Sequence, residues 1–528
     1  MAVAVLLLAG CSTEEGGAAL DLFAYNASDG IRSIDPAKAT DLETLWVVDQ
    51  LYEGLLELGE DLEVRPALAE RWSVSADGRV YRFKLRGAQF HDGSPVTASD
   101  VRASFDRLLD PNEALPGRWV LRGLREGGIR TLGEDSLELE LKAPNPVFAS
   151  LLATPNAAIV KGGGRHGDPD VEDLGSGPFQ LQGWLPETAM VLHRHPAYWM
   201  RDEEGKGLPY LDGVRIEFNR EIGGEMLGFE QGRYDFVSSP PPEWMRVLFD
   251  DEGKWRPDWA GRFVRHSVPF LKTDYIGVLM DTAALAGLGT AAPHVDLRRA
   301  MSMALDRPAL VREFRAGLAT PAQGFVPPGM PGFGRTTHAD LDHDPDRARQ
   351  LLGDLGIGPE GPLQRWDAGV LGTKPETAEL AAALQFTWAQ FGIDVAVDVA
   401  PSGIDAERVA KSQVPLFRKS WLADYPDAEN FLGLFLSERW CPNGPNYTHF
   451  SSPVVDSLLA AAAQEGSREA RLRSLSHAEQ SVLAEMPVIP LWHDDVTHLV
   501  SAEWEGWSIQ STNRLDLRRV RRTGRDKE

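Results

Sequence analysis

Two short segments carry residue types and spacings that do chemistry in other proteins. Residues 162–167 satisfy the G-x-G-x-x-G pattern, but a dinucleotide site also needs a helix that starts there and points its N–H groups at the pyrophosphate. The Asp-Pro-Asp run that follows has no helical period. Residues 342–346 imitate the start of a calcium loop, yet Arg347 and Gly353 occupy the positions where that loop requires Gly and Glu. We therefore expect both segments to be structural, with Asp344 as the N-cap of a helix over residues 347–352.

Histidine and serine are the other candidates for catalysis or metal binding. His193 and His195 are spaced to share one face of a strand, but no third ligand lies nearby in the sequence. None of the 12 histidines is followed by Glu, so the zinc-binding H-E-x-x-H helix is absent. No serine has Gly at both −2 and +2, as a nucleophile elbow requires. We expect no metal, no cofactor and no enzymatic activity.

The composition restricts the class of partner. The 528 residues carry a formal net charge of −24, which argues against nucleic acid because binding a polyanion needs a cationic face. The 43% apolar content and 15 Trp argue against disorder. After the N-terminus, no segment approaches the roughly 18 apolar residues that a membrane span needs. The two cysteines, Cys11 and Cys441, define no disulfide framework, and we expect Cys441 to be a buried or inert thiol.

The elements that would position a site alternate between strands and helices. Strict apolar–polar alternation predicts strands at residues 81–85, 137–141, 214–218 and 393–399. Helical spacing predicts helices at residues 295–314, 378–391, 454–463 and 468–485, and one that begins at the cap Thr97 and ends before Pro111. This interleaving indicates an α/β chain with mixed sheets.

The N-terminal residues indicate export. Ten small or apolar residues precede Cys11, and the chain becomes polar directly after it, as in the core of a signal peptide. The run from Leu8 to Cys11 resembles the bacterial lipobox, which implies a lipidated Cys11, a membrane anchor and a periplasmic or cell-surface location. An ordinary apolar start with a buried cysteine is the alternative.

One block of the sequence resembles a known family. It comprises Pro66–Trp72, the Asp-Gly turn at 77–78, the strand at 81–86 and the segment 90–101 with its Phe-His-Asp-Gly-Ser-Pro run. This block closely resembles the family 5 extracellular solute-binding proteins, the oligopeptide- and dipeptide-binding components of ABC importers. Matching motifs follow in order at residues 34–36, 51–55, 175–179, 195–199, 209–213, 297–307, 447–459 and 486–491. Most of these residues build the fold rather than bind, since residues 81, 83 and 85 share a core-facing side.

The resemblance implies a periplasmic-binding-protein-like fold of type II, with two lobes, a hinged cleft and an additional domain. We expect a signal peptide and tether at 1–19, lobe I from 20–50, 172–275 and 485–520, an additional domain at 51–171 inserted in lobe I, lobe II at 276–484, and a basic tail at 521–528. The implied function is capture of short peptides and their delivery to the ABC permease subunits of the inner membrane. We expect a monomer.

The family likeness also indicates site residues. In this family, the Asp that binds the amino terminus of the peptide lies in a Trp-x-Ala-Asp-Tyr stretch. The matching stretch here is 421–425, which places Asp424 at the anchoring position with Trp421 and Tyr425 beside it. Arg418 matches an Arg that can meet the peptide carboxylate with two parallel hydrogen bonds. Tyr25 and Asn26 follow the first strand and are expected to line the cleft.

Each of these assignments has a structural alternative. Asp424 can be a turn residue before Tyr-Pro, Arg418 a member of an ion pair, and Trp421 a core residue. The ligand can also be an oligosaccharide, a nickel chelate or an opine, because one fold hosts several functions. A sensory or chaperone role, or an extracellular hydrolase, are the competing classes.

Overall fold

The computed structural model describes residues 20–164, 174–250, 253–331, 333–334, 337–360 and 366–524, apart from the side chains of Ile222, Trp366 and Glu376. The chain divides into two compact units, which we call unit 1 (1–267 and 497–528) and unit 2 (268–496). The predicted signal segment 1–19, with Cys11, lies outside the described residues.

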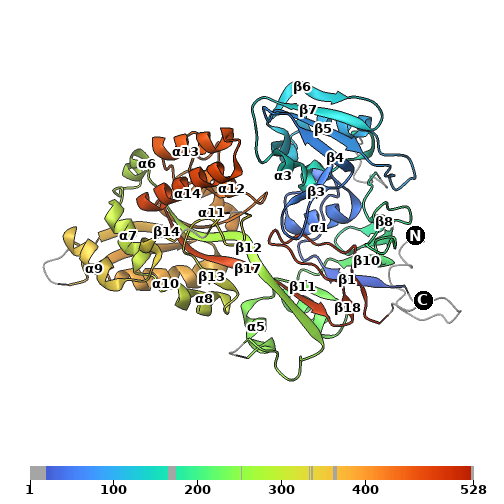
Figure 1. Ribbon diagram of the computed structural model, residues 1–528. Helices are drawn as coiled ribbons and strands as arrows, with labels where there is room; N and C mark the ends of the chain where they lie inside the picture. The colour runs from blue at the N-terminus through green and yellow to red at the C-terminus, as the bar shows by residue number, and fades with distance from the viewer. Residues whose placement is uncertain are drawn as a thin grey trace. The chain divides into compact units, whose positions relative to one another are not determined.

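Unit 1 is built on a mixed sheet. Its strand order is β11–β1–β10–β9–β8. β1 runs parallel to β10 and β11, whereas β9 pairs antiparallel with β8 and β10. The bounds are β1 Leu22–Asn26, β8 Phe179–Leu185, β9 Ala189–Arg194, β10 Gly213–Glu217 and β11 Phe236–Ser238, and the helices nearby are α1 Leu42–Leu51, α4 Ile222–Glu230 and α5 Pro242–Leu248 (Figure 1).

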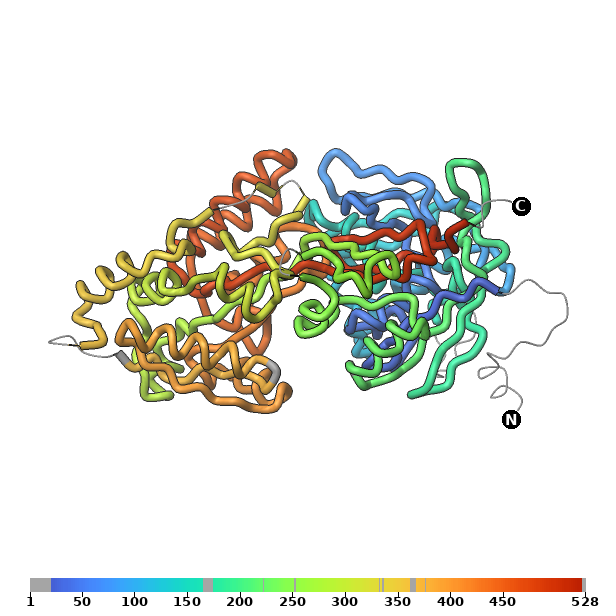
Figure 2. The backbone as a smooth tube through the Cα atoms, turned by 90° about the horizontal axis from the view of Figure 1, so that it is seen from below, coloured from blue at the N-terminus to red at the C-terminus, as the bar shows by residue number. Residues whose placement is uncertain are grey.

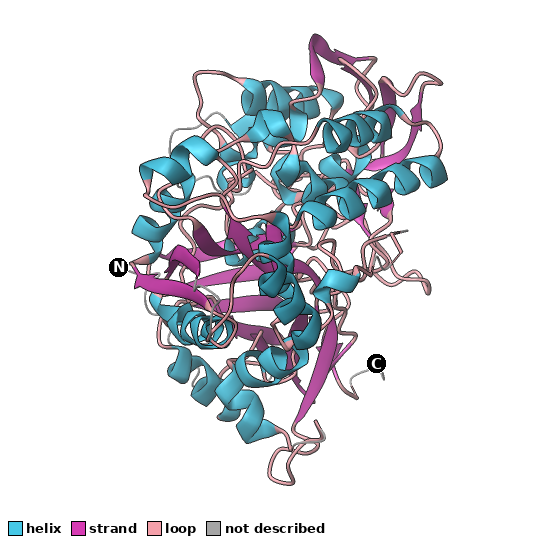
Figure 3. Cartoon of the chain, turned by 90° about the vertical axis from the view of Figure 1, so that its left-hand side faces the viewer, coloured by secondary structure: helices cyan, strands magenta, loops and turns pink. Residues whose placement is uncertain are grey.

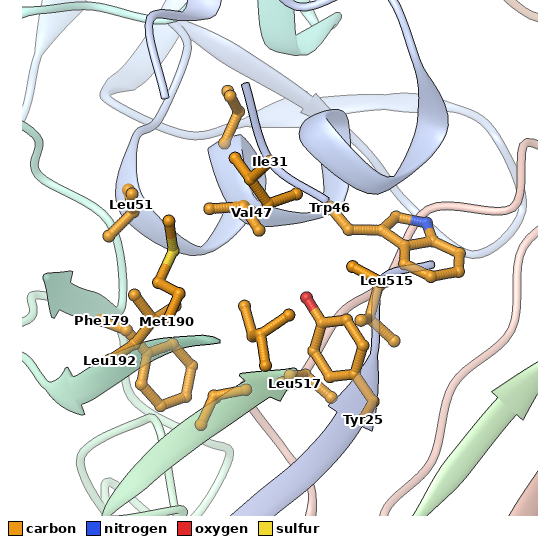
Figure 4. Close-up of a cluster of buried hydrophobic side chains, with 14 of the residues drawn as sticks. Tyr25, Ile31, Trp46, Val47, Leu51, Phe179, Met190, Leu192, Leu515 and Leu517 are labelled. Carbon is orange, nitrogen blue, oxygen red and sulfur yellow. The ribbon is translucent and has the colours of Figure 1, made fainter. Parts of the chain in front are cut away.

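The core of unit 1 forms where α1 packs against this sheet. Figure 4 shows side chains of α1 facing those of β8 and β9, with residues from near the C-terminus beside them. Burying each large apolar side chain contributes about 1.5–3 kcal/mol. The labelled members are Tyr25, Ile31, Trp46, Val47, Leu51, Phe179, Met190, Leu192, Leu515 and Leu517.

A second, antiparallel sheet of unit 1 has the order β4–β5–β7–β6. Its strands are β4 Ala69–Val74, β5 Val80–Leu85, β6 Leu124–Thr131 and β7 Ser136–Leu141, followed or flanked by α2 Ala98–Leu109 and α3 Phe148–Leu152. Two small ladders join β2 Leu56–Leu58 with β3 Val64–Pro66 and β18 Trp504–Glu505 with β19 Arg521–Arg522. The predicted core face of β5 is confirmed, because Tyr81, Phe83 and Leu85 are at most 5% exposed.

The strands of unit 2 follow the order β15–β14–β16–β12–β17, with β13 paired to β17, and belong to the same 11-stranded mixed sheet, since β17 also pairs with β11. β14 runs parallel to β15 and β16, and β16 runs antiparallel to β12. The strands are β12 Phe263–Val278, β13 Ala319–Pro321, β14 Trp366–Thr373, β15 Ile393–Val399, β16 Leu416–Leu422 and β17 Val488–Ser501. The two long strands β12 and β17 run side by side in Figure 2.

Helices flank the strands of unit 2 (Figure 3). Among the contacts are α10 against β15, α7 against α9 and α13 against α14. The helices are α6 Thr282–Gly287, α7 Val295–Met303, α8 Arg307–Arg315, α9 Pro345–Asp354, α10 Ala378–Ala389, α11 Ser402–Ala410, α12 Ala428–Leu432, α13 Pro453–Gln464 and α14 Arg468–Glu485.

The single helix predicted at 295–314 is wrong, since two helices occupy this region. Asp306 caps α8 by accepting a hydrogen bond from the Ala309 N–H, and Pro308 occupies its first turn. Pro lacks the N–H that a continuous helix would use, so α7 ends at Met303 and the chain restarts. No described helix is both long and apolar enough to cross a membrane.

Candidate functional site

The predicted anchor segment lies in unit 2, where β16 leads into α12. β16 pairs with β12 so that Arg418 lies opposite Ile276 and Ser420 opposite Asp274. After β16 the chain turns, and Asp427 caps α12 by accepting a hydrogen bond of 2.9 Å from the Glu429 N–H. The turn therefore holds residues 423–427 between a sheet strand and a capped helix start.

A buried ion pair fixes this turn. Arg471 on α14 donates to both carboxylate oxygens of Asp427, at 2.7 and 2.8 Å, and to Glu429 at 2.9 Å. Its side chain is only 7% exposed. Two parallel N–H···O bonds define orientation as well as energy, so the segment that carries Asp424 is anchored from both sides.

Asn430 joins three of the predicted site residues. Its Oδ1 accepts hydrogen bonds from the Trp421 indole N–H at 2.8 Å and from the Asp424 backbone N–H at 3.4 Å. Its Nδ2 donates to the Asp424 carboxylate at 3.4 Å, and it interacts with the Tyr425 hydroxyl. Sequence reasoning missed Asn430 as a site residue, although an amide directly before the apolar pair Phe431 and Leu432 is a signal that could have found it.

The Asp424 carboxylate is the acidic group at the centre of this arrangement. Its side chain is exposed, yet surrounding protein atoms restrict its hydration and raise the pKa of the carboxyl, an effect that the hydrogen bond from Asn430 partly offsets. Within the described residues, no ion pair joins Asp424 to a basic side chain. Burial also raises the pKa of Tyr425, as do the charges of Glu429 and Asp427. Asp424 is therefore an oriented carboxylate that can accept a cation.

Arg418 is not in the environment expected of a side chain whose guanidinium is free to bind a ligand. Its guanidinium pairs with Asp274 of β12, so the ion-pair alternative describes it. Burial lowers its pKa, while the charge of Asp494 acts in the opposite direction. Its Nε makes no hydrogen bond to the described residues.

Arg418 belongs to a larger group around two buried carboxylates, which we call the charge cluster: Lys272, Asp274, Arg315, Arg418 and Asp494. Lys272 lies 3.1 Å from Asp274 and also pairs with Asp494, which lies 2.8 Å from Arg315. The three cations outnumber the two carboxylates by one charge. Such a group can attract an anion.

Tyr25 and Asn26 lie in unit 1, at the end of β1. Tyr25 is wholly buried, with its ring against Trp46 and Phe236, so its side chain belongs to the core instead of presenting a surface to ligand. Asn26 is 4% exposed and exchanges two hydrogen bonds with the backbone of Asn219. The structure thus groups Trp421, Asp424 and Tyr425, and it leaves Tyr25 and Asn26 in the other unit.

The remaining candidates have structural roles. His195 is 2% exposed and its Nδ1 lies 3.2 Å from the Gly177 carbonyl oxygen. Cys441 is buried, as predicted, with its sulfur 3.2 Å from His449 Nε2. Asp344 caps α9, also as predicted. In the described part of the chain, no group of three or more His, Cys, Asp or Glu side chains is arranged to hold a metal ion.

The chain is thus an α/β protein with mixed sheets, and its candidate site carries a carboxylate without a basic partner in the described structure. The model of the bacterial extracellular solute-binding proteins, family 5 (middle region), matches residues 63–441, and the chain belongs to this family. These are binding proteins of ABC importers.

Similar proteins cover nearly the whole chain. The glutathione-binding protein GsiB of Salmonella choleraesuis is 28% identical over 486 residues, which are 89% of this chain and 88% of that protein. The oligopeptide-binding protein OppA of Bacillus subtilis is 26% identical over 520 residues, 92% of this chain and 90% of that protein. The solved structure of the Escherichia coli murein tripeptide binding protein MppA has a TM-score of 0.75 at 24% identity and covers 96% of this chain and 99% of its own. The predicted type II fold is thereby confirmed.

Proposed function

We propose that this protein captures short peptides outside the cytoplasmic membrane and delivers them to the permease subunits of an ABC importer. Family membership and two relatives named for binding glutathione and oligopeptides support this proposal. The observation that carries it is the Asp424 carboxylate, oriented by Asn430 and without a basic partner in the described structure.

Asp424 would bind the ammonium group at the amino terminus of the peptide. A charge-assisted hydrogen bond of this kind contributes about 1.5–3 kcal/mol net. Because restricted hydration makes the lone carboxylate unfavourable, a ligand ammonium stabilises the ionised form and gains more than it would in water. Trp421 and Tyr425 would line the same place, since both interact with Asn430.

The charge cluster would serve the opposite end of the peptide. Its surplus positive charge favours a carboxylate nearby, and the buried Nε of Arg418 has no hydrogen-bond partner among the described residues. Arg418, paired on one side with Asp274, would therefore meet the peptide carboxylate with part of its guanidinium only.

The compartment and the domain division complete the proposal. Lipidation at Cys11 would tether the protein at the periplasmic or cell-surface side, where the family of extracellular solute-binding proteins acts. Residues 51–171, which contain the four-stranded sheet, would form the additional domain, with lobe I from 20–50, 172–275 and 485–520 and lobe II from 276–484. The protein would act as a monomer without enzymatic activity.

The decisive experiment compares peptides with free and blocked amino groups. Isothermal titration calorimetry with mixed di- to pentapeptides should show binding that N-acetylation weakens about 10- to 100-fold, the equivalent of one charge-assisted contact. Asp424→Asn should weaken the binding of peptides with a free amino group by the same factor and leave the affinity for the acetylated peptides unchanged.

The matched control is Asp354→Asn, which neutralises an exposed carboxylate at the end of α9 in the same unit. It should bind peptides as the parent protein does. Binding of oligosaccharides, nickel with histidine, or opines, with none of peptides, would refute the proposed function while leaving the family assignment intact.

A further inference from the structure

The chain between α5 and β12 contains a cluster of aromatic rings that lies apart from the peptide-anchor segment. Its described parts, 242–250 and 253–265, belong to unit 1, and Figure 1 shows α5 near the end of β12 from which that strand starts. Phe249 follows α5 and pairs with Trp255 in an antiparallel bridge. The rings form one chain of contacts, Phe249–Trp255, Trp255–Phe263 and Phe263–Trp259, with centroids 4.2, 6.3 and 6.1 Å apart.

This aromatic cluster is fixed to the body of unit 1. Phe263 stacks on Phe229 of α4, with ring centroids 4.2 Å apart, and these two rings and Phe249 are at most 7% exposed. The backbone is held as well, because the Ala502 N–H donates to the Arg262 carbonyl oxygen at 2.9 Å. Side chains on this segment are therefore carried by packed structure.

Two exposed arginines lie over the rings of the cluster. The guanidinium carbon of Arg262 is 5.2 Å from the ring centroid of Trp259 and 5.1 Å from that of Phe263. The guanidinium carbon of Arg265 is 4.7 Å from the ring centroid of Phe249. An aromatic face attracts a guanidinium, so both side chains lose freedom before any partner arrives, and less entropy is lost when one binds.

Carbonyl oxygens orient two of the exposed guanidinium groups further. Arg262 donates to the Glu230 carbonyl oxygen at 2.6 Å, and Arg256 donates to that of Phe249 at 3.1 Å. Within the described residues, no ion pair joins Arg256, Arg262 or Arg265 to a carboxylate. Because a guanidinium has five N–H donors, each of the three keeps donors for a partner. We call these arginines, with Trp255 and Trp259, the arginine–aromatic surface.

The charge of the segment indicates the kind of partner. Residues 242–265 contain five basic and five acidic residues, so the segment has no net charge that would attract a membrane or a nucleic acid. Guanidinium groups held in place instead match individual carboxylates, each with two parallel hydrogen bonds. Arg and Trp are also enriched among the residues that carry the binding energy of protein–protein interfaces.

We propose that the arginine–aromatic surface docks on a protein surface that presents carboxylates, namely the extracytoplasmic face of the permease. The proposal rests on the proposed function, which supplies a permease as the partner. It adds the place on unit 1 where the contact is made and the chemistry of that contact.

Charge reversal separates docking from ligand capture. In cells whose own copy of the gene is deleted, the double variant Arg262→Glu, Arg265→Glu should import peptide at least about 10-fold more slowly than the parent protein, because carboxylates would then face carboxylates. Its peptide affinity in calorimetry should equal that of the parent, which also shows that it folds. Import at the parent rate would overturn this inference and leave the proposed function standing. A loss of peptide affinity that accounts for the slower import would overturn it too.

Arg122→Glu is the matched control for charge reversal. Arg122 is exposed, lies in unit 1, and makes no ion pair or ring contact with the described residues. The variant should import peptide as the parent protein does. Slowing equal to that of the double variant would show that total charge matters rather than the arginine–aromatic surface.

Photocrosslinking tests the partner without any peptide. The photoreactive residue p-benzoyl-phenylalanine, placed at the exposed Ala260, should crosslink to an epitope-tagged permease subunit. The same residue placed at Val74 of β4, which is 44% exposed, should not. The crosslink should disappear when Arg262→Glu and Arg265→Glu are added. Adducts with lipid alone, or no adduct, would overturn the proposal. A crosslink to the permease from a protein that binds no peptide would refute the proposed function and retain the docking surface.

Discussion

At the scale of single residues, two charges six positions apart have opposite surroundings. Asp424 is exposed, and no basic side chain pairs with it in the described structure. Arg418 is mostly buried and pairs with Asp274, whose side chain is 1% exposed. A carboxylate without a cation is open to a ligand, whereas a guanidinium in a buried pair first stabilises the fold. The family likeness placed both at the site, and the contacts separate their roles.

Removing one partner of this buried pair should be costly. Asp274→Asn leaves Lys272, Arg315 and Arg418 with the single carboxylate of Asp494. Breaking a buried pair by deleting one partner costs about 3–5 kcal/mol, so we expect the urea midpoint to fall clearly. Asp274→Asn combined with Arg418→Met should recover part of the loss, because the unpaired charge is gone. A double variant less stable than Asp274→Asn would contradict this account.

His498 should give unit 1 a pH dependence. It is fully buried, with Nε2 2.8 Å from Asn513 Oδ1, and burial lowers its pKa to about 4, with a smaller contribution from His266. The unfolded chain takes up a proton below the ordinary histidine value of about 6.5, and the folded protein does so only near 4. Stability is therefore lost as the pH falls from about 6.5 to about 4, by about 3 kcal/mol.

The measurement compares the parent protein with His498→Gln across this range. The difference in unfolding free energy between them should change by that amount in favour of the variant as the pH falls. Groups common to both proteins cancel in the difference. A difference that stays constant from pH about 6.5 to about 4 would show that His498 is protonated in the folded state as easily as in the unfolded chain.

At the scale of elements, local sequence patterns predicted most of the helices and strands named from the sequence. The alternation at 393–399 is β15, and the helical spacing at 468–485 is α14. These signals are local, because side-chain periodicity reports which face is buried. The split at residues 304–306 was missed, although Asp306 followed by Pro308 is itself a helix-start signal.

The site was less predictable, because its contacts join distant parts of the chain. Arg418 and Asp274 are 144 residues apart, and their pairing depends on the register between β16 and β12. A pocket in unit 1 is lined by both Glu43 and Glu225, whose spacing in the sequence matches no motif. Asp424, Trp421 and Tyr425 were named from the family likeness alone, and their ligand-binding role stays a prediction.

The cap of α2 offers a test of an element that the sequence did predict. Thr97 accepts a hydrogen bond from the Asp100 N–H, and Asp100 accepts one from the Thr97 N–H at 3.0 Å, which completes a capping box. Thr97→Ala should cost about 1 kcal/mol of unfolding free energy in urea. Thr97→Ser keeps the hydroxyl and should cost a few tenths at most. Equal losses in the two variants would show that the methyl group of Thr97 matters rather than its cap.

At the scale of the whole molecule, the chain passes between the two units twice. The crossings fall at residues 267–268 and 496–497, inside the long strands β12 and β17. Relative motion of domains is the default expectation unless their interface is large and hydrophobic. If a peptide binds to both units at once, it favours one arrangement of them, because a ligand shifts an equilibrium by its differential affinity for the two states.

We therefore expect ligand to change the dimensions of the protein in solution. Small-angle X-ray scattering should show a smaller radius of gyration at saturating peptide than without it, since closure around a ligand brings the units together. Asp424→Asn at the same peptide concentration should keep the ligand-free value, and regain the smaller one only when the concentration is raised in proportion to its weaker affinity. An unchanged radius at a concentration that calorimetry shows to be saturating would mean that capture occurs within one unit, and closure would then have no part in the transport cycle.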